Sequence, residues 1–92
     1  MNYLEDNLTK WRLIILKPAE RYLKRLSSEH QARIIRALKL LQQDRNLVDI
    51  KSLQGRPEWR LRVGNYRILF VIDPENTIYT VTLIKPRGDV YK

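Results

Sequence analysis

The chain has 92 residues, enough for one small domain, and it contains no cysteine, which excludes disulfides and thiolate metal sites. Its 18 Lys and Arg residues against 10 Asp and Glu residues give a net charge of +8, which favours polyanionic partners such as nucleic acid. The apolar runs, such as residues 13–16 and 68–72, are far too short to span a bilayer, and we expect a cytoplasmic protein with no membrane partner.

The N-terminal part of the chain predicts an extension followed by a strand. Residues 1–10 show no hydrophobic period, and residues 1–11 are expected to form an N-terminal extension before a single domain over residues 12–92. The segment WRLIILK, residues 11–17, is short, partly β-branched and almost continuously apolar. This pattern predicts a strand buried on both faces.

Two helices are predicted next. Pro18 suits the first turn of a helix, and the apolar residues that follow it up to Leu26 have the spacing of an amphipathic helix. Ser28 and Gln31 form an S-x-x-Q pattern, which predicts the capped start of a second helix. The short break between the two segments predicts a helical hairpin. Residues 43–58 are polar and irregular, and they predict a loop.

The rest of the sequence predicts β-structure. WRLRV (59–63) and YRILFVI (66–72) flank Gly64 and Asn65, and a two-residue loop with Gly first is typical of a type II′ hairpin turn. TIYTVTLIK (77–85) alternates and is rich in β-branched residues, which predicts a further strand. The order β-α-α-β-β-β predicts an α+β fold, in which a helical hairpin packs on one face of a mainly antiparallel sheet.

The two-residue turn fixes the register of the predicted hairpin. Val63 lies opposite Tyr66, and counting outward places Arg62 opposite Arg67. The apolar face of the hairpin then comprises Trp59, Leu61, Val63, Tyr66, Ile68 and Phe70. The opposite face carries the arginines Arg60, Arg62 and Arg67. If residues 73–76 form the next turn, Thr82 lies beside Arg67.

The opposed arginines indicate a binding site. Like charges directly opposite each other destabilise a sheet, so a purely structural sequence would place Glu or Thr across from Arg62. The alternative is a solvated arginine face, which costs little free energy. We favour an anion site on the open face of the sheet. Lys85, Arg87 and Tyr91 follow closely at the C-terminus, where a charged tail without a function is the alternative interpretation.

Other chemistries have little support in the sequence. The sole histidine, His30, lies at a helix start without cysteine neighbours, which indicates a surface residue rather than a metal ligand. No closely set pair of carboxylates has the spacing of metal ligands, and neither a Walker loop nor a G-x-G-x-x-G motif occurs. We therefore expect no metal and no other cofactor.

Three segments are distinctive in combination: LKPAERYLKRL after the first strand, LQGRPEWRLRVGNYRILFVID through the hairpin, and the ending RGDVY. Together they resemble the RelE/ParE superfamily of bacterial toxins from type II toxin–antitoxin systems, and the RelE-like branch in particular. The resemblance covers roughly residues 12–92. In this superfamily the RelE branch cleaves messenger RNA at the ribosome, whereas the ParE branch acts on DNA gyrase.

The resemblance implies a set of catalytic residues. The family has basic positions on the central hairpin, basic residues at and after the end of the last strand, and a terminal tyrosine. These positions match, in chain order, Arg60, Arg62, Arg67, Lys85, Arg87 and Tyr91. They are the same residues that the hairpin register and the C-terminal segment single out.

The implied function is a toxin that cleaves mRNA on the ribosome, without a metal, and that a cognate antitoxin neutralises. The ribose 2′-OH would attack the adjacent phosphorus while the arginines stabilise the phosphorane. Neighbouring cations favour an ionised phenol, which makes Tyr91 a candidate base, and Lys85 or Arg87 would orient the leaving group. Two alternatives are kept: a ParE-like toxin that binds gyrase without nuclease activity, and a non-catalytic RNA-binding module.

Overall fold

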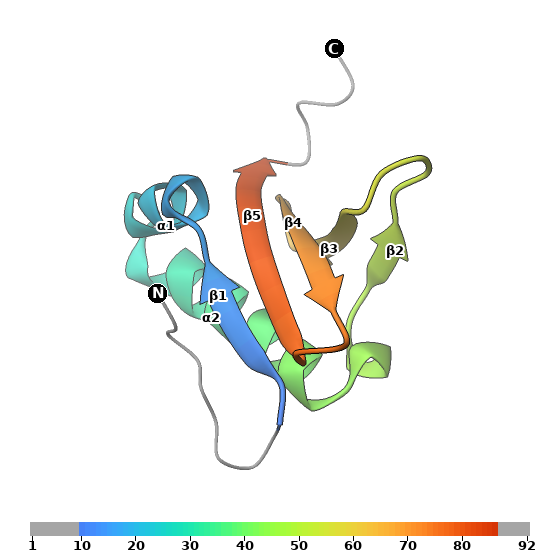
Figure 1. Cartoon of the computed structure of the whole chain (residues 1–92). Helices are drawn as coiled ribbons and strands as arrows, with labels where there is room; N and C mark the ends of the chain where they lie inside the picture. The colour runs from blue at the N-terminus through green and yellow to red at the C-terminus, as the bar shows by residue number, and fades with distance from the viewer. Residues whose placement is uncertain (1–9, 87–92) are drawn as a thin grey trace.

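The computed structural model describes residues 10–86, which form one five-stranded sheet and two α-helices (Figure 1). In chain order the elements are β1 (Arg12–Ile15), α1 (Lys17–Lys24), α2 (Ser28–Gln43), the 3-10 helix η1 (Arg45–Leu47), β2 (Ile50–Ser52), β3 (Trp59–Val63), β4 (Tyr66–Asp73) and β5 (Ile78–Pro86). The strand order is β1-β5-β4-β3-β2, with β1 parallel to β5 and the other neighbours antiparallel. The predicted α+β fold and its element order are confirmed, and β2 is an additional strand.

β2 lies inside the segment that the sequence predicts to be a loop. Its three residues form the edge of the sheet beside β3 (Figure 1). Strands usually have about five or six residues, so a three-residue strand in a polar segment leaves too little alternation to detect. The paired residues are Ile50 with Leu61, Lys51 with Arg60, and Ser52 with Trp59.

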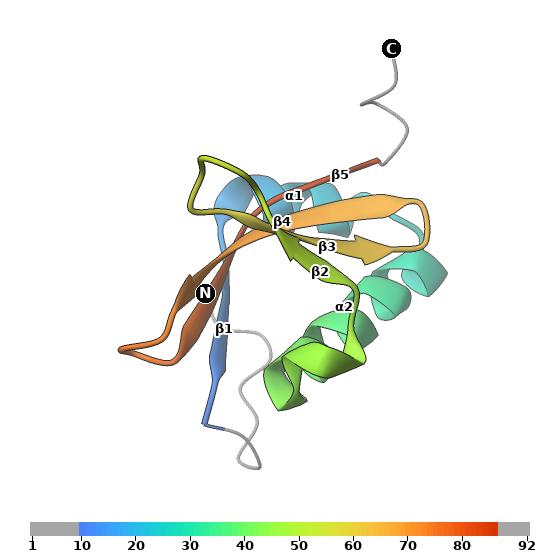
Figure 2. The same cartoon turned by 90° about the vertical axis from the view of Figure 1, so that its right-hand side faces the viewer.

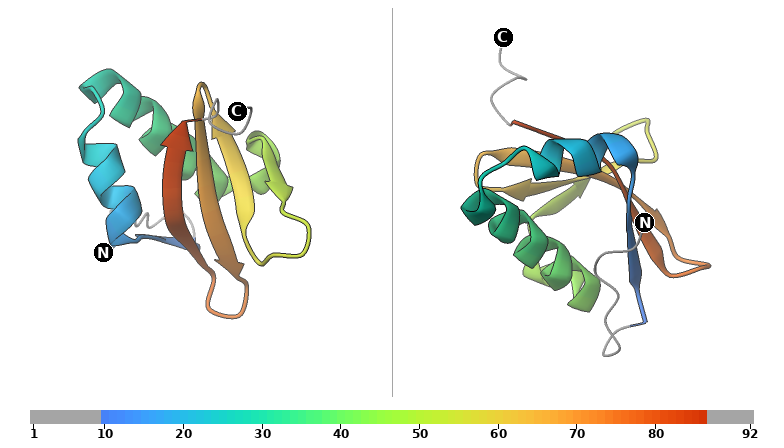
Figure 3. Two further views of the ribbon diagram at one scale, coloured as in Figure 1. Left: turned by 90° about the horizontal axis from the view of Figure 1, so that it is seen from above. Right: turned by 90° about the vertical axis from the view of Figure 1, so that its left-hand side faces the viewer.

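Both helices lie on the same side of the sheet, as the prediction of a helical hairpin requires (Figure 3). The N-cap of α2 is Ser27, whose hydroxyl oxygen accepts a hydrogen bond from the His30 amide at 3.3 Å. The side chain of Gln31 donates to the Leu26 carbonyl at 3.0 Å. The prediction that Ser28 caps this helix is therefore wrong by one residue, because Ser27 is the N-cap. Neither helix is long and apolar enough to cross a membrane, within residues 10–86.

β1 is an edge strand and is not buried on both faces, in contrast to the prediction. Leu13 and Ile15 are buried, whereas Arg12 is exposed and Ile14 is half-buried. Within the described part of the chain the strand pairs only with β5, and no strand lies along its other edge. A short apolar run does not show whether one face of a strand or both faces are covered.

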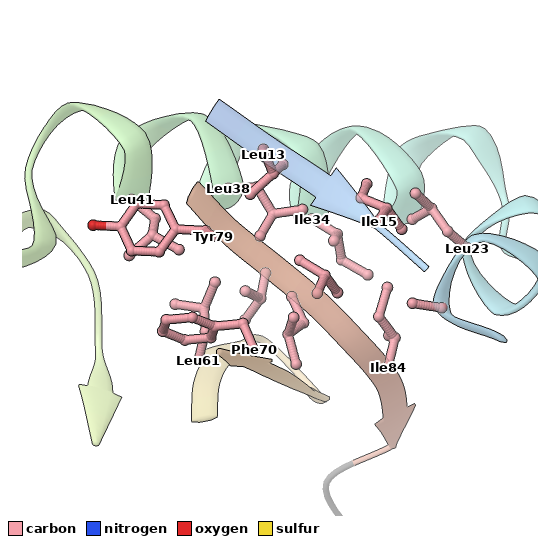
Figure 4. Close-up of a cluster of buried hydrophobic side chains, with 14 residues drawn as sticks. Leu13, Ile15, Leu23, Ile34, Leu38, Leu41, Leu61, Phe70, Tyr79 and Ile84 are labelled. Carbon is pink, nitrogen blue, oxygen red and sulfur yellow. The ribbon is translucent and has the colours of Figure 1, made fainter. Parts of the chain in front are cut away.

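The hydrophobic core fills the space between the helices and the inner face of the sheet (Figure 4). Fully burying a large apolar side chain contributes roughly 1.5–3 kcal/mol, so this contact holds the two layers together. Of the six residues predicted for the apolar face of the hairpin, four are buried and two are half-buried against the core. The buried residues are Leu61, Val63, Ile68 and Phe70, and the half-buried residues are Trp59 and Tyr66.

The hairpin of β3 and β4 has the predicted register. Val63 lies opposite Tyr66, and Arg62 lies opposite Arg67. Gly64 has a φ of +55°, whereas Asn65 has a negative φ, as a type II′ turn requires. The turn therefore fixes which residues face the helices and which face away from them.

The register between β4 and β5 differs from the prediction. The strands pair further than expected, up to Asp73, and the register shifts at an irregularity next to Leu69. As a result Lys85, and not Thr82, lies opposite Arg67. Thr82 lies at the irregularity, where its hydroxyl donates a hydrogen bond to the Leu69 carbonyl at 3.3 Å. The turn begins one residue later than expected, which moves the partner of Arg67 by two residues, and the extra residue at the irregularity moves it by one more; together these shifts explain the error.

Candidate nucleic-acid interface

Three cations from three neighbouring strands form a row on the sheet face that points away from the core. Figure 2 shows α2 along the other side of strands β3 and β4. Arg62 on β3 lies opposite Arg67 on β4, and Arg67 lies opposite Lys85 on β5. Residues that pair directly across strands share one face of the sheet, and neighbouring strands lie about 4.8 Å apart. The sheet thus fixes three positive charges in a line, which we call the cationic row.

The two arginines of the cationic row have unsatisfied donors. The Nε atoms of Arg62 and Arg67 are buried and have no hydrogen-bond partner in the described part of the chain. No member of the row forms an ion pair with another part of residues 10–86. A buried donor without a partner costs about 1–3 kcal/mol, and guanidinium groups match the geometry of phosphate oxygens. The charged ends of these side chains, rather than the buried Nε atoms, are the groups that a phosphate at this face would contact.

Arg60 faces the same side as Arg62 but is held differently. It is only 8% exposed, and its Nη1 atom lies 3.3 Å from the Asp49 carboxylate. The Asp49 carbonyl also accepts a hydrogen bond from the Arg62 amide at 3.1 Å. Asp49 therefore holds both arginines of β3, and it partly neutralises the charge of Arg60. The sequence pattern did not single out this carboxylate.

An open groove of about 330 Å³ lies beside the three arginines of the hairpin. Its walls are residues 51–54, from β2 and the loop after it, and the arginines Arg60, Arg62 and Arg67. Lys51 is a further cation at this groove, and the sequence did not reveal it because β2 was not predicted. The alternation of inward-facing Ile50 and outward-facing Lys51 is the only signal in the sequence that points to it.

His30 contacts the hairpin and is half-buried, which the sequence did not predict. Its Nδ1 atom lies 2.6 Å from the Tyr66 hydroxyl, and the two rings meet edge to face with their centroids 5.6 Å apart. Tyr66 pairs with Pro86 at the end of β5. The contact thus joins α2 to the end of the sheet. No group of three or more potential metal-ligating side chains occurs among residues 10–86.

The predicted site residues divide into two groups. Arg60, Arg62, Arg67 and Lys85 come together on one face of the sheet, as the strand register and the groove show. Arg87 and Tyr91 lie outside the described residues.

The fold and the cationic row define a small α+β protein with one basic open sheet face. The sequence matches the model of the family described as ParE toxin of type II toxin-antitoxin system, parDE, over residues 13–91. The chain therefore belongs to this family, within the RelE/ParE superfamily of toxins.

Several solved toxin–antitoxin complexes contain a chain with the same fold. The RelE–RelB complex of Pyrococcus horikoshii matches with a TM-score of 0.76 and 24% identity, over 88% of this chain and 99% of that chain. The RelBE2 complex of Mycobacterium tuberculosis matches with a TM-score of 0.71 and 21% identity, over 86% and 100% of the two chains. The RelBE complex of E. coli matches with a TM-score of 0.68 and 15% identity, over 80% and 93%. No curated protein matches the sequence.

Proposed function

We propose that the protein is a ribosome-dependent endoribonuclease that cleaves mRNA and thereby inhibits translation. The observation that carries this proposal is the cationic row, whose three aligned cations form no ion pair within residues 10–86. During RNA cleavage, negative charge builds up on the phosphorane in the transition state. Cations that the sheet already holds in place stabilise this charge without reorganising, and such stabilisation often contributes more to catalysis than any other single effect.

The proposed reaction needs no metal. The ribose 2′-OH attacks the adjacent phosphorus, which leaves a 2′,3′-cyclic phosphate and a 5′-OH. The attacking oxygen loses a proton, and the leaving 5′-oxygen gains one. Arginine stays protonated, so the strand arginines stabilise charge and do not act as bases. Tyr91 is the proposed general base, and Lys85 and Arg87 orient the leaving group. The ribosome would hold the RNA in line for attack.

The family match supports a second candidate function. Because the matching model is that of the ParE toxin, the chain is also a candidate for a toxin that binds DNA gyrase and cuts no nucleic acid. The basic face would then contact a protein surface. This alternative predicts inhibition of gyrase and unchanged messenger RNA.

The deciding experiment maps the 5′ ends of messenger RNA in a translating system that contains the protein. New 5′ ends should appear only on messages under translation, and Arg67→Ala should lower the cleavage rate by about 100- to 1000-fold. Arg12→Ala is the matched control, because Arg12 is an exposed strand arginine outside the cationic row. If the parent protein makes no new 5′ ends and instead inhibits DNA supercoiling, the gyrase alternative replaces the nuclease proposal.

A cognate antitoxin is the second part of the proposal. The similar structures of Pyrococcus horikoshii and E. coli are complexes of a toxin with its antitoxin. For this chain, with its net charge of +8, we propose an antitoxin with an acidic segment that covers the cationic row. Exposed charges are screened over about 8 Å at physiological ionic strength, so affinity should fall as salt is added. An affinity that does not change with salt would contradict this proposal and indicate an apolar interface.

A further inference from the structure

Lys51 extends the positive charge of the open face onto a fourth strand. It lies on β2 directly opposite Arg60, so both side chains are on the same face of the sheet. Lys51 is exposed, and it forms no ion pair within residues 10–86. It lines the same groove as Arg62 and Arg67. The groove therefore has an available cation at the edge of the sheet as well as in its middle.

The charges of the face lie at two levels along the strands. The first level is the cationic row, and the second level is the pair Lys51–Arg60. Residues two apart on one strand are separated by about 6.6 Å, which sets the step between Arg62 and Arg60. Because Asp49 already pairs with Arg60, Lys51 supplies the available charge at the second level.

The second level is charged only on the β2 side of the sheet. Across β4 and β5 the positions at this level are Leu69 and Leu83, which pair with each other and carry no charge. An anionic strand whose phosphate occupies the cationic row therefore finds its next cation toward Lys51. Residues 51–54 form the wall of the groove on that side.

We propose that Lys51 binds a second phosphate of a single-stranded RNA substrate, next to the phosphate held by Arg62 and Arg67. The RNA strand then leaves the site across the β2 edge of the sheet. The step between the two levels is comparable with the separation of successive phosphates in an extended strand. Proteins commonly follow a single strand with such a basic groove. This assignment rests on the proposed function, because it takes RNA as the substrate, and it adds a binding residue to the site.

The test measures binding of an uncleavable 2′-O-methyl RNA trinucleotide, which has two phosphates, in the absence of ribosomes. Calorimetry over a series of salt concentrations compares the parent protein with Lys51→Gln. The variant should bind about 2- to 5-fold more weakly, as expected for the loss of one exposed ion pair. The slope of log affinity against log salt should fall by about 0.7, the value for one phosphate contact with a single strand. Lys51→Arg should restore the slope, since it keeps the charge.

Two matched controls separate this contact from a general charge effect. Lys39→Gln removes an exposed lysine from α2, on the helical side of the molecule, and should keep the affinity and slope of the parent protein. In the RNA, each phosphate is replaced in turn by a neutral methylphosphonate. For one of the two replacements, the parent protein and Lys51→Gln should bind equally well, because the partner of Lys51 is then absent.

The assignment of Lys51 is overturned if Lys51→Gln has the affinity and slope of the parent protein, if neither methylphosphonate removes the difference, or if the parent protein does not bind the trinucleotide. Because this RNA cannot be cleaved, the result does not depend on nuclease activity. Binding through Lys51 without cleavage on ribosomes would refute the proposed nuclease and keep the assignment. If the protein cleaves mRNA on ribosomes but Lys51→Gln has the salt slope of the parent protein, the nuclease proposal stands and the assignment of Lys51 is refuted.

Discussion

Arg62 and Arg67 lie directly opposite each other on β3 and β4, and the Nε atom of each is buried without a hydrogen-bond partner among residues 10–86. Cross-strand pairs change stability by roughly 0.2–1 kcal/mol, and like charges lie at the unfavourable end of this range. Each buried donor without a partner adds a further cost. The hairpin therefore gives up stability to hold two cations side by side, which is the arrangement expected of a binding site and not of a purely structural sheet.

Replacing one of the two arginines should stabilise the protein. We expect Arg62→Thr to raise the free energy of unfolding by about 0.5–1 kcal/mol, because it removes a like-charge pair and places a β-branched residue in a strand. Urea denaturation measures the change. Arg12→Thr is the control, since Arg12 is an exposed strand arginine that lies opposite Ile78, and its effect should stay within about 0.5 kcal/mol. A less stable Arg62→Thr variant would mean that packing of the arginine side chain outweighs the repulsion.

The Asp49–Arg60 ion pair should contribute more to stability than an exposed pair. The side chain of Arg60 is 10% exposed and that of Asp49 is 61% exposed, so Asp49→Asn leaves a nearly buried charge with a weaker partner. We expect a loss of about 1 kcal/mol in the free energy of unfolding. The loss is no larger because Asp49 is largely exposed and water screens its charge. The matched control is Glu58→Gln, which leaves Arg56 at 55% exposure, where water can solvate it.

Both of these variants should be compared by chemical denaturation at the same pH. The control should lose less than about 0.5 kcal/mol, as is usual for surface pairs. Equal losses for Asp49→Asn and Glu58→Gln would show that Arg60 does not depend on Asp49. In that case the aliphatic part of Arg60 alone accounts for its position in the sheet.

The hairpin shows how much of the site a sequence can predict. The turn at Gly64 fixes one pair of residues, and the strict alternation of strands then determines every other pair, so Arg62 and Arg67 could be placed together in advance. The position of Lys85 could not be predicted in this way. It depends on where the next turn begins and on the irregularity beside Leu69, and neither feature changes the hydrophobic alternation.

Lys51 and Asp49 were not predicted to belong to the site for a related reason. Both belong to a short polar segment whose conformation depends on pairing with β3, and the alternation of Ile50 and Lys51 is too short a signal to predict that pairing. The burial of Arg60 likewise depends on a carboxylate eleven positions earlier in the chain. Contacts of this kind come from the tertiary structure, whereas the periodicity of a strand or helix is local and is visible in the sequence.

The turn between β4 and β5 should make stability depend on pH. The Asn76 side chain and amide donate hydrogen bonds to the Asp73 carboxylate at 2.9 and 3.2 Å. These bonds favour the ionised form and lower the pKa of Asp73 below its ordinary value. Because the pKa is lower in the folded state, the contribution to stability is present above the ordinary value, about 4, and is lost as the pH falls through the folded value.

Asn76→Ala should therefore destabilise the protein at about pH 7, and its difference from the parent protein should shrink below about pH 4. Thermal unfolding at a series of pH values measures this difference, and an NMR titration of the Asp73 carboxyl shows whether its pKa has risen. A stability difference that stays constant over the whole pH range would mean that Asn76 acts through the shape of the turn and not through the charge of Asp73.

Tyr91→Phe tests the proposed general base, a residue outside the described part of the chain. The phenylalanine keeps the ring for stacking on a base and removes the hydroxyl. If Tyr91 is the base, the variant should bind ribosomes as the parent protein does, cleave messenger RNA about 100-fold more slowly or worse, and be tolerated by growing cells. Tyr3→Phe, in the expected N-terminal extension, is the matched control and should cleave normally.

The toxicity of the Tyr91→Phe variant shows whether Tyr91 acts through its ring, by stacking on a base, or through its hydroxyl, as the general base. If this variant kills cells as the parent protein does, the tyrosine stacks on a base and another group takes the proton from the 2′-OH. Comparison with Arg67→Ala extends the test to the cationic row, because both variants should lose toxicity if RNA cleavage kills the cell. If both variants stay fully toxic, the nuclease proposal fails, and binding to gyrase becomes the better explanation of the basic face.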